Sequence, residues 1–136
     1  MRLKFSPEKM KIRIVIFFNY WLPPILWAAL IFSLSGVPNL NSGLEAFWDV
    51  FLRKLVHATE FGVLFLLLFR AWRGYDFKFW PAWFLSLILA AGYAFLDEFH
   101  QLFVLERQGK FFDIFIDSLG ILFCAAIILF FKLRKK

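Results

Sequence analysis

The stretch IVIFFNYWLPPILWAALIFSL, Ile14–Leu34, decides the fold of this chain, because all 21 of its residues are uncharged. A helix needs about 20 mostly apolar residues to cross the roughly 30 Å of hydrocarbon in a membrane. Pro23 and Pro24 lie inside the stretch and remove two backbone donors, so we expect a kink there. The carbonyls of Asn19 and Tyr20, one turn earlier, should then lose their helical partners. The stretch therefore predicts a first membrane span that is bent at its prolines.

The composition of the whole chain agrees with a membrane protein. Of 136 residues, 62% are apolar and 19% are charged, and 21 are Phe. A soluble domain is about 45–50% apolar and about 25% charged, and a disordered chain is poor in aromatic residues. The single cysteine, Cys124, excludes an internal disulfide framework and a Cys-rich zinc site. The net charge of +6 does not require a nucleic-acid partner, since membrane proteins concentrate Lys and Arg on their cytoplasmic side.

Three further apolar runs complete the predicted architecture. They cover Leu55–Trp72, most of Phe79–Val104, and Asp113–Phe131. The runs are continuous, whereas the strands of a membrane β-barrel alternate apolar and polar residues over about ten positions. We therefore expect an all-α integral membrane protein, a four-helix bundle.

The distribution of Lys and Arg predicts its orientation. Twelve of the 16 such residues fall on one side: five in the N-terminal tail, three near the loop between the second and third spans, and four in the C-terminal tail. Basic residues favour the cytoplasmic side, so both termini should be cytoplasmic. The expected organisation is a basic tail over residues 1–13, a four-span transmembrane domain over residues 14–131, and a basic tail over residues 132–136.

The first loop carries a signal for a short helix. The sequence SGLE at residues 42–45 is typical of a capping box, in which Ser42 and Glu45 satisfy each other's backbone donors. Apolar residues then follow at helical spacing from Phe47 to Leu55. We expect a helix from about Gly43 that lies along the outer interface before the second span, or one that only anchors the chain.

Polar residues within the spans point to a site. Ionisable groups inside a bilayer are costly and normally face the bundle interior or a wet cavity. At 1.5 Å per residue, those of the second, third and fourth spans share one depth, just below the outer surface. We expect them to meet in one outward-opening polar cluster, formed by Lys54, His57, Glu60, Asp97, Glu98, His100, Gln101, Asp113 and Asp117.

Plain structural roles compete with a functional one. Lys54 can extend to the interface, and Asp113 can cap the helix that begins beside it. Asp97 and Glu98 lie near a helix C-terminus, where the helix dipole opposes negative charge, so they require cationic partners. Structural ion pairing and a binding site both remain open for the cluster as a whole.

The same residues resemble those of VanZ-like membrane proteins. Residues 53–61, RKLVHATEF, are similar to the R-K-x-x-H-F-x-E-Y segment of that family, and residues 97–101, DEFHQ, to its D-E-x-x-Q signature. Arg107, Asp113, Asp117 and Gly120 follow where the family carries R, D, N or D, and G. Ala58 and Phe61 depart from the family's Phe and Tyr. The resemblance implies a bacterial multi-pass protein of the cytoplasmic membrane and a link to teicoplanin resistance.

Three functions follow from these observations. The first is a non-catalytic envelope accessory that binds membrane lipids, a lipid-linked cell-wall precursor or a glycopeptide, with no role for nucleic acid. The second is an intramembrane hydrolase or transferase acting on a lipid head group or phosphate linkage, with a divalent metal as one alternative for its chemistry. Movement of ions or protons ranks last, since the inner halves of the spans lack ionisable residues. The oligomeric state stays open.

The candidate residues divide by role. The candidate catalytic residues are His57, Glu60, Asp97, Glu98 and His100. The candidate ligand-binding residues are Lys54, Gln101, Arg107, Asp113 and Asp117. The candidate metal ligands are Glu60, Asp97, Glu98 and Asp117.

Overall fold

The first span consists of two helices joined at the predicted break. In the computed structural model, which describes residues 7–37, 45–104 and 111–135, α1 covers Pro7–Tyr20 and α2 covers Leu22–Ser35. Trp21 separates them, and the two prolines fall in the first turn of α2, where a missing N–H is tolerated. The kink predicted from the prolines is confirmed.

The carbonyl released by the break finds a new donor. Pro23 has no N–H to offer the oxygen of Asn19 four residues earlier, and Arg70 Nη1 donates to that oxygen instead, at 3.0 Å. The Arg70 guanidinium also lies 5.0 Å from the centre of the Tyr20 ring. An arginine of the second span thus stabilises the bend in the first.

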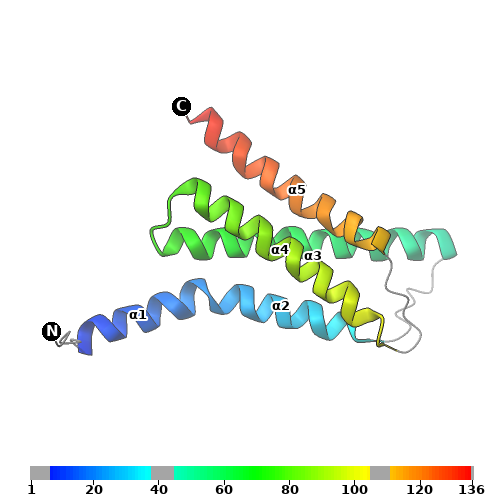
Figure 1. The fold of residues 1–136 in the computed structure, drawn as a ribbon, viewed down its shortest axis with the longest axis horizontal. Coiled ribbons are helices and arrows are strands. Elements are labelled where there is room, and N and C mark those ends of the chain that lie inside the picture. The colour runs from blue at the N-terminus through cyan, green and yellow to red at the C-terminus, as the bar shows by residue number, and fades with distance from the viewer. Residues whose placement is uncertain (1–6, 38–44, 105–110, 136) are drawn as a thin grey trace.

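Three long helices form the rest of the bundle. They are α3, Ala46–Gly74; α4, Phe79–Gln101; and α5, Phe111–Arg134. Figure 1 shows that the spans alternate in direction, so both ends of the chain lie at one end of the bundle. Four helical segments are long and apolar enough to cross a membrane: Met10–Ser35, Phe47–Gly74, Phe79–Gln101 and Phe112–Arg134. The all-helical, four-span fold expected from hydropathy is confirmed.

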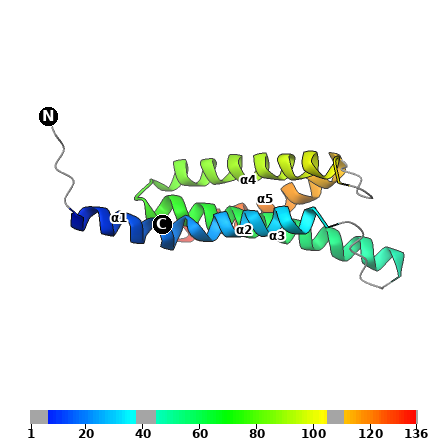
Figure 2. The ribbon, with the colours of Figure 1, turned by 90° about the horizontal axis from the view of Figure 1, so that it is seen from below.

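The start of α3 differs from the prediction. Glu45 has φ −53° and ψ 145°, outside the helical region, and its side chain makes no capping bond, so the helix begins at Ala46. Ser42 lies outside the described residues. From Ala46 the helix runs unbroken to Gly74, without the expected turn between an interfacial helix and the span. Its sequence contains no proline to break it, and Figures 1 and 2 show its first turns extending beyond the neighbouring helices.

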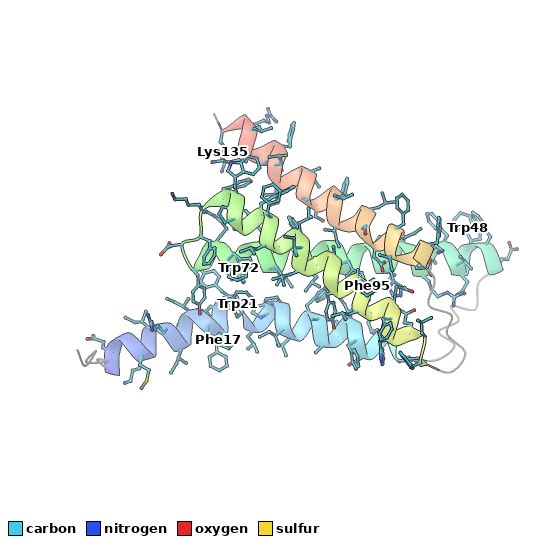
Figure 3. All side chains as sticks on the ribbon, in the orientation of Figure 1. Phe17, Trp21, Trp48, Trp72, Phe95 and Lys135 are labelled. Atoms are coloured by element: carbon cyan, nitrogen blue, oxygen red, sulfur yellow. The ribbon has the colours of Figure 1, made fainter. Side chains whose placement is uncertain are left out.

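The core lies along α3, which packs against α2, α4 and α5. Phe61 and Phe65 of α3 are fully buried, and they are joined by Ile31 of α2, Ala94 of α4 and Ile121 of α5. The opposite faces of the helices are apolar but exposed, for example Phe123 at 68% and Ile88 at 62%. Such a surface suits hydrocarbon rather than water. In Figure 3 the aromatic side chains of Trp21 and Trp72 meet at the end near the termini, whereas Trp48 lies at the opposite end of α3.

Candidate functional site

The polar residues of four helices gather at the end of the bundle opposite the termini. In the structure the polar cluster consists of Ser35 of α2, His57 and Glu60 of α3, Asp97, Glu98 and Gln101 of α4, and Asp117 of α5. The elements that carry them approach one another at the right-hand side of Figure 1. Ser35, Asp97, Glu98, Gln101 and Asp117 are all buried.

Asp97 is fully satisfied by neighbouring side chains. Ser35 Oγ donates to its Oδ1 at 2.6 Å, and Gln101 Nε2 donates to its Oδ2 at 2.9 Å. Hydrogen bonds to both oxygens of a buried carboxylate fix its position. Gln101, a candidate ligand-binding residue, is therefore engaged with Asp97, and Asp97 ties the end of α2 to α4.

Asp117, in contrast to Asp97, has no hydrogen-bond donor among the described residues. Its side chain is 1% exposed, and neither carboxylate oxygen accepts a hydrogen bond from the described residues. Four other acids, Glu98, Asp97, Asp113 and Glu60, lie close enough to act on it electrostatically, Glu98 most strongly. A buried carboxylate without a donor costs several kcal/mol unless a proton or a cation joins it. Asp117 is thus a group in the polar cluster whose requirement the described side chains leave unmet.

His57 lies between two of these acids. Its Nδ1 is 3.9 Å from Glu60 Oε2 on the same helix and 4.0 Å from Asp117 Oδ1 on α5. Both distances are within ion-pair range and too long for a hydrogen bond. The structure therefore brings together His57, Glu60 and Asp117, which are 60 positions apart at most in the sequence.

Lys54 and Asp113 form an ion pair at the rim of the cluster. Lys54 Nζ donates to Asp113 Oδ1, and the two side chains are 31% and 30% exposed. The ammonium also lies 5.1 Å from the centre of the Phe112 ring. Asp113 falls in the first turn of α5, where an acid favours the helix dipole. The capping role considered for Asp113 thus coexists with pairing to Lys54.

His100, a candidate catalytic residue, lies beside the polar cluster and not within it. His100 stacks on Phe32 of α2, with ring centres 4.3 Å apart and an interplanar angle of 28°. It packs α4 against α2 beside the polar cluster. Arg107 lies outside the described residues.

Close backbone contact between α3 and α5 sets the position of His57 relative to Asp117. A Cβ placed on Gly120 would lie 1.8 Å from the carbonyl oxygen of Ala58, and one on Gly62 would lie 2.9 Å from Cys124 Sγ. Small residues let membrane helices approach in this way. Ala58 follows His57 directly, and Gly120 lies one turn after Asp117, so the contact brings the two polar side chains together.

Three residues that the sequence analysis did not select hold α2 to this site. Ser35 donates to Asp97, Trp27 Nε1 donates to the Glu60 carbonyl at 2.9 Å, and Tyr93 OH donates to the Ala28 carbonyl at 2.7 Å. A signal existed for Ser35, since it ends the first span at the depth of the other polar residues.

The predicted metal ligands do not form a metal site among the described residues. No group of three or more His, Cys, Asp or Glu side chains in residues 7–37, 45–104 and 111–135 is arranged to hold an ion. Both oxygens of Asp97 accept hydrogen bonds, from Ser35 and from Gln101. Metal binding by Glu60, Asp97, Glu98 and Asp117 therefore stays a prediction.

Comparison with known proteins gives one result. No curated protein and no solved structure matches the chain. The model of the VanZ/LLP1 family matches residues 5–132, which span all five helices apart from the last two residues of α5. With its four membrane-spanning helices and its polar cluster at the end of the bundle opposite the termini, the chain belongs to the VanZ/LLP1 family.

Proposed function

We propose that this VanZ/LLP1 family member is a non-catalytic accessory protein of the bacterial cell envelope. Its polar cluster binds the head group of a membrane lipid, a lipid-linked cell-wall precursor or a glycopeptide. The observation that supports this proposal is Asp117, a buried carboxylate with no hydrogen-bond donor among the described residues. A site that a ligand completes is expected to contain such a group.

The proposal places the protein in the cytoplasmic membrane with both termini inside. The basic residues described at the terminal end of the bundle, such as Lys11, Arg13, Lys132 and Arg134, support this orientation. The polar cluster then faces the outer leaflet, where precursors and glycopeptides are found. Fusions of green fluorescent protein and of alkaline phosphatase to Lys136 test it. The first fusion is expected to fluoresce and the second to lack phosphatase activity. An active phosphatase would show that the C-terminus lies outside, which contradicts the proposed orientation.

Resistance is tested in cells. Expression in a teicoplanin-sensitive host should raise the tolerated teicoplanin concentration, and Asp117→Asn should remove the effect at equal protein level. Glu8→Gln is the matched control, since it removes an exposed carboxylate at the other end of the bundle. If expression of the wild-type protein leaves the tolerated teicoplanin concentration unchanged in several hosts, the resistance role is contradicted.

Binding is tested directly on the purified protein. Native mass spectrometry after extraction from membranes should show a lipid or lipid-linked molecule retained by wild type and lost in Asp117→Asn. Glu8→Gln should retain it. Equal retention by all three proteins would place the ligand elsewhere.

A second function, an intramembrane hydrolase or transferase, is favoured by one observation. A histidine nitrogen facing carboxylates is the arrangement that orients a general base, and His57 Nδ1 lies within 4.0 Å of Glu60 and Asp117. Incubation with phospholipids or a lipid-linked precursor in nanodiscs, followed by mass spectrometry, distinguishes the two functions. Product formed by wild type and not by His57→Asn would favour the enzyme over the binding protein.

A further inference from the structure

Two arginines near the end of α3 are held in place by backbone carbonyls. Arg70 Nη1 donates to the Asn19 oxygen at 3.0 Å, and Arg73 Nη1 donates to the Phe77 oxygen at 2.6 Å. The guanidinium of Arg70 also lies 5.0 Å from the centre of the Tyr20 ring. Each of these bonds uses a single N–H, and a guanidinium carries several others. Both exposed side chains are therefore fixed while most of their donors stay available to a further partner.

Neither arginine is neutralised by a carboxylate. No acid among the described residues forms an ion pair with Arg70 or Arg73. The described acid nearest to them in the sequence is Asp76, in the turn to α4, and Lys78 follows it with a further positive charge. The membrane-crossing segment of α3 ends at Gly74, so both arginines lie in its last turns, at the level of the head groups. Two fixed and unpaired positive charges thus stand at the membrane surface next to the chain termini.

The surface below the arginines is apolar. Arg70 and Arg73 are one helical turn apart, which places their Cβ atoms about 5–6 Å from each other. Val63 and Leu66 continue the same face of α3 toward the middle of the membrane, and both are partly exposed. Guanidinium groups above a strip of apolar side chains match the two parts of a phospholipid, its phosphate and its acyl chain.

We propose that Arg70 and Arg73 bind the phosphate of an anionic phospholipid in the leaflet next to the chain termini, with an acyl chain along Val63 and Leu66. A guanidinium meets phosphate oxygens with paired N–H donors, whereas a lysine ammonium is a point charge. A zwitterionic lipid would bring its own ammonium to a surface where positive charge is in excess, so a lipid with net negative charge is favoured. The site is separate from the polar cluster and does not depend on the proposed function.

Orientation in the membrane is a competing reason for basic residues at this end of the bundle. Orientation requires the charge alone, and neither the guanidinium group nor its fixed position contributes to it. Arg73→Lys keeps the charge and removes the paired donors, so it separates the two explanations. Arg73 also suits the test because it does not contact the junction of α1 and α2, which Arg70 supports.

Lipid affinity is measured by native mass spectrometry of the purified chain in detergent, titrated with phosphatidylglycerol or with phosphatidylcholine. Wild type should bind phosphatidylglycerol more tightly than phosphatidylcholine. Arg73→Gln should weaken the binding of phosphatidylglycerol about tenfold or more, since charge-assisted hydrogen bonds are lost. Arg73→Lys should also bind more weakly than wild type. Equal affinities of wild type for the two lipids, or of wild type and Arg73→Lys for phosphatidylglycerol, overturn the proposal.

Arg134→Gln is the matched control. It removes the same charge from an exposed arginine at the same end of the bundle, one whose guanidinium lies 5.5 Å from the centre of the Phe130 ring. A single basic residue near an anionic surface changes binding by about fivefold or less, so this variant should keep most of the affinity for phosphatidylglycerol. Equal losses in Arg134→Gln and Arg73→Gln overturn the site, because a general attraction to the basic end would explain both.

Two further measurements test the shared phosphate and its source. If Arg70 and Arg73 hold one phosphate, the loss of affinity in the double variant with Arg70→Gln and Arg73→Gln is smaller than the product of the two single losses. Losses that multiply overturn a shared phosphate. Inorganic phosphate at the concentration of the lipid should not displace phosphatidylglycerol, because the acyl chain contributes to binding. Displacement would overturn a lipid as the ligand.

Discussion

Replacing Gly120 by alanine tests the helix contact on which the polar cluster depends. The added Cβ would lie 1.8 Å from the Ala58 oxygen and 2.5 Å from its carbonyl carbon. These are backbone atoms, which cannot rotate away, so α5 must move by about 1.6 Å to reach an ordinary contact of 3.4 Å. Overpacking of this kind costs about 3 kcal/mol, which is more than a hundredfold in the unfolding equilibrium.

Gly92→Ala provides the matched control. Gly92 is also helical, but a Cβ there would meet nothing within 4 Å. Alanine favours a helix over glycine by about 1 kcal/mol, so this variant should be neutral or slightly more stable. Reversible unfolding in mixed detergent micelles measures both free energies. Equal values for the two variants would refute the close contact between α3 and α5.

Two further substitutions test hydrogen bonds between helices. Ser35→Ala leaves buried Asp97 without one of its donors and should lower the free energy of unfolding by about 1–3 kcal/mol. The control is Ser33→Ala, on the exposed face of α2, which should change this free energy by less than about 0.5 kcal/mol. A similar loss in both would contradict the bond to Asp97. Arg70→Met removes the donor to the Asn19 carbonyl and should speed amide hydrogen exchange around the junction of α1 and α2, measured by mass spectrometry. Unchanged exchange there would show that the arginine does not support the break.

The spans could be predicted because the membrane imposes a strong, local requirement on the sequence. About 20 apolar residues in a row leave few alternatives to a helix, and the prolines in the first span located its break to within two residues. The break did not reveal what would satisfy the released carbonyl. Arg70 is 51 residues from Asn19, and only the packed bundle brings the two together.

The start of α3 shows where local signals mislead. The residues SGLE match a capping box and predict a helix from about Gly43, yet the backbone of Glu45 is extended and the helix begins at Ala46. Capping contributes about 1 kcal/mol, so packing and the connection to α2 can outweigh it. The apolar residues from Phe47 onward predict a short helix that lies along the outer interface or only anchors the chain. Their pattern contains no information on whether this helix continues in line into the span.

Apart from Ser35, the membership of the polar cluster followed from depth, but its pairings did not. Helical rise placed Glu60, Asp97 and Asp117 in one layer, since ionisable groups avoid the hydrocarbon. Depth alone cannot tell which of them a neighbour satisfies. That Asp97 is fully bonded while Asp117 is not depends on the rotation of each helix about its axis. The contact of Gly120 with Ala58 fixes this rotation only for α5 against α3.

The length of α3 has a mechanical consequence. Its 29 residues extend about 44 Å, well beyond the 30 Å of a typical hydrocarbon layer, so the helix must either tilt or extend past that layer. Trp48 lies in the first turn of α3, and Arg70 lies about 33 Å further along the same helix. A molecule that binds α3 near Trp48 and shifts this helix along its axis therefore also shifts Arg70, the donor to the Asn19 carbonyl at the junction of α1 and α2.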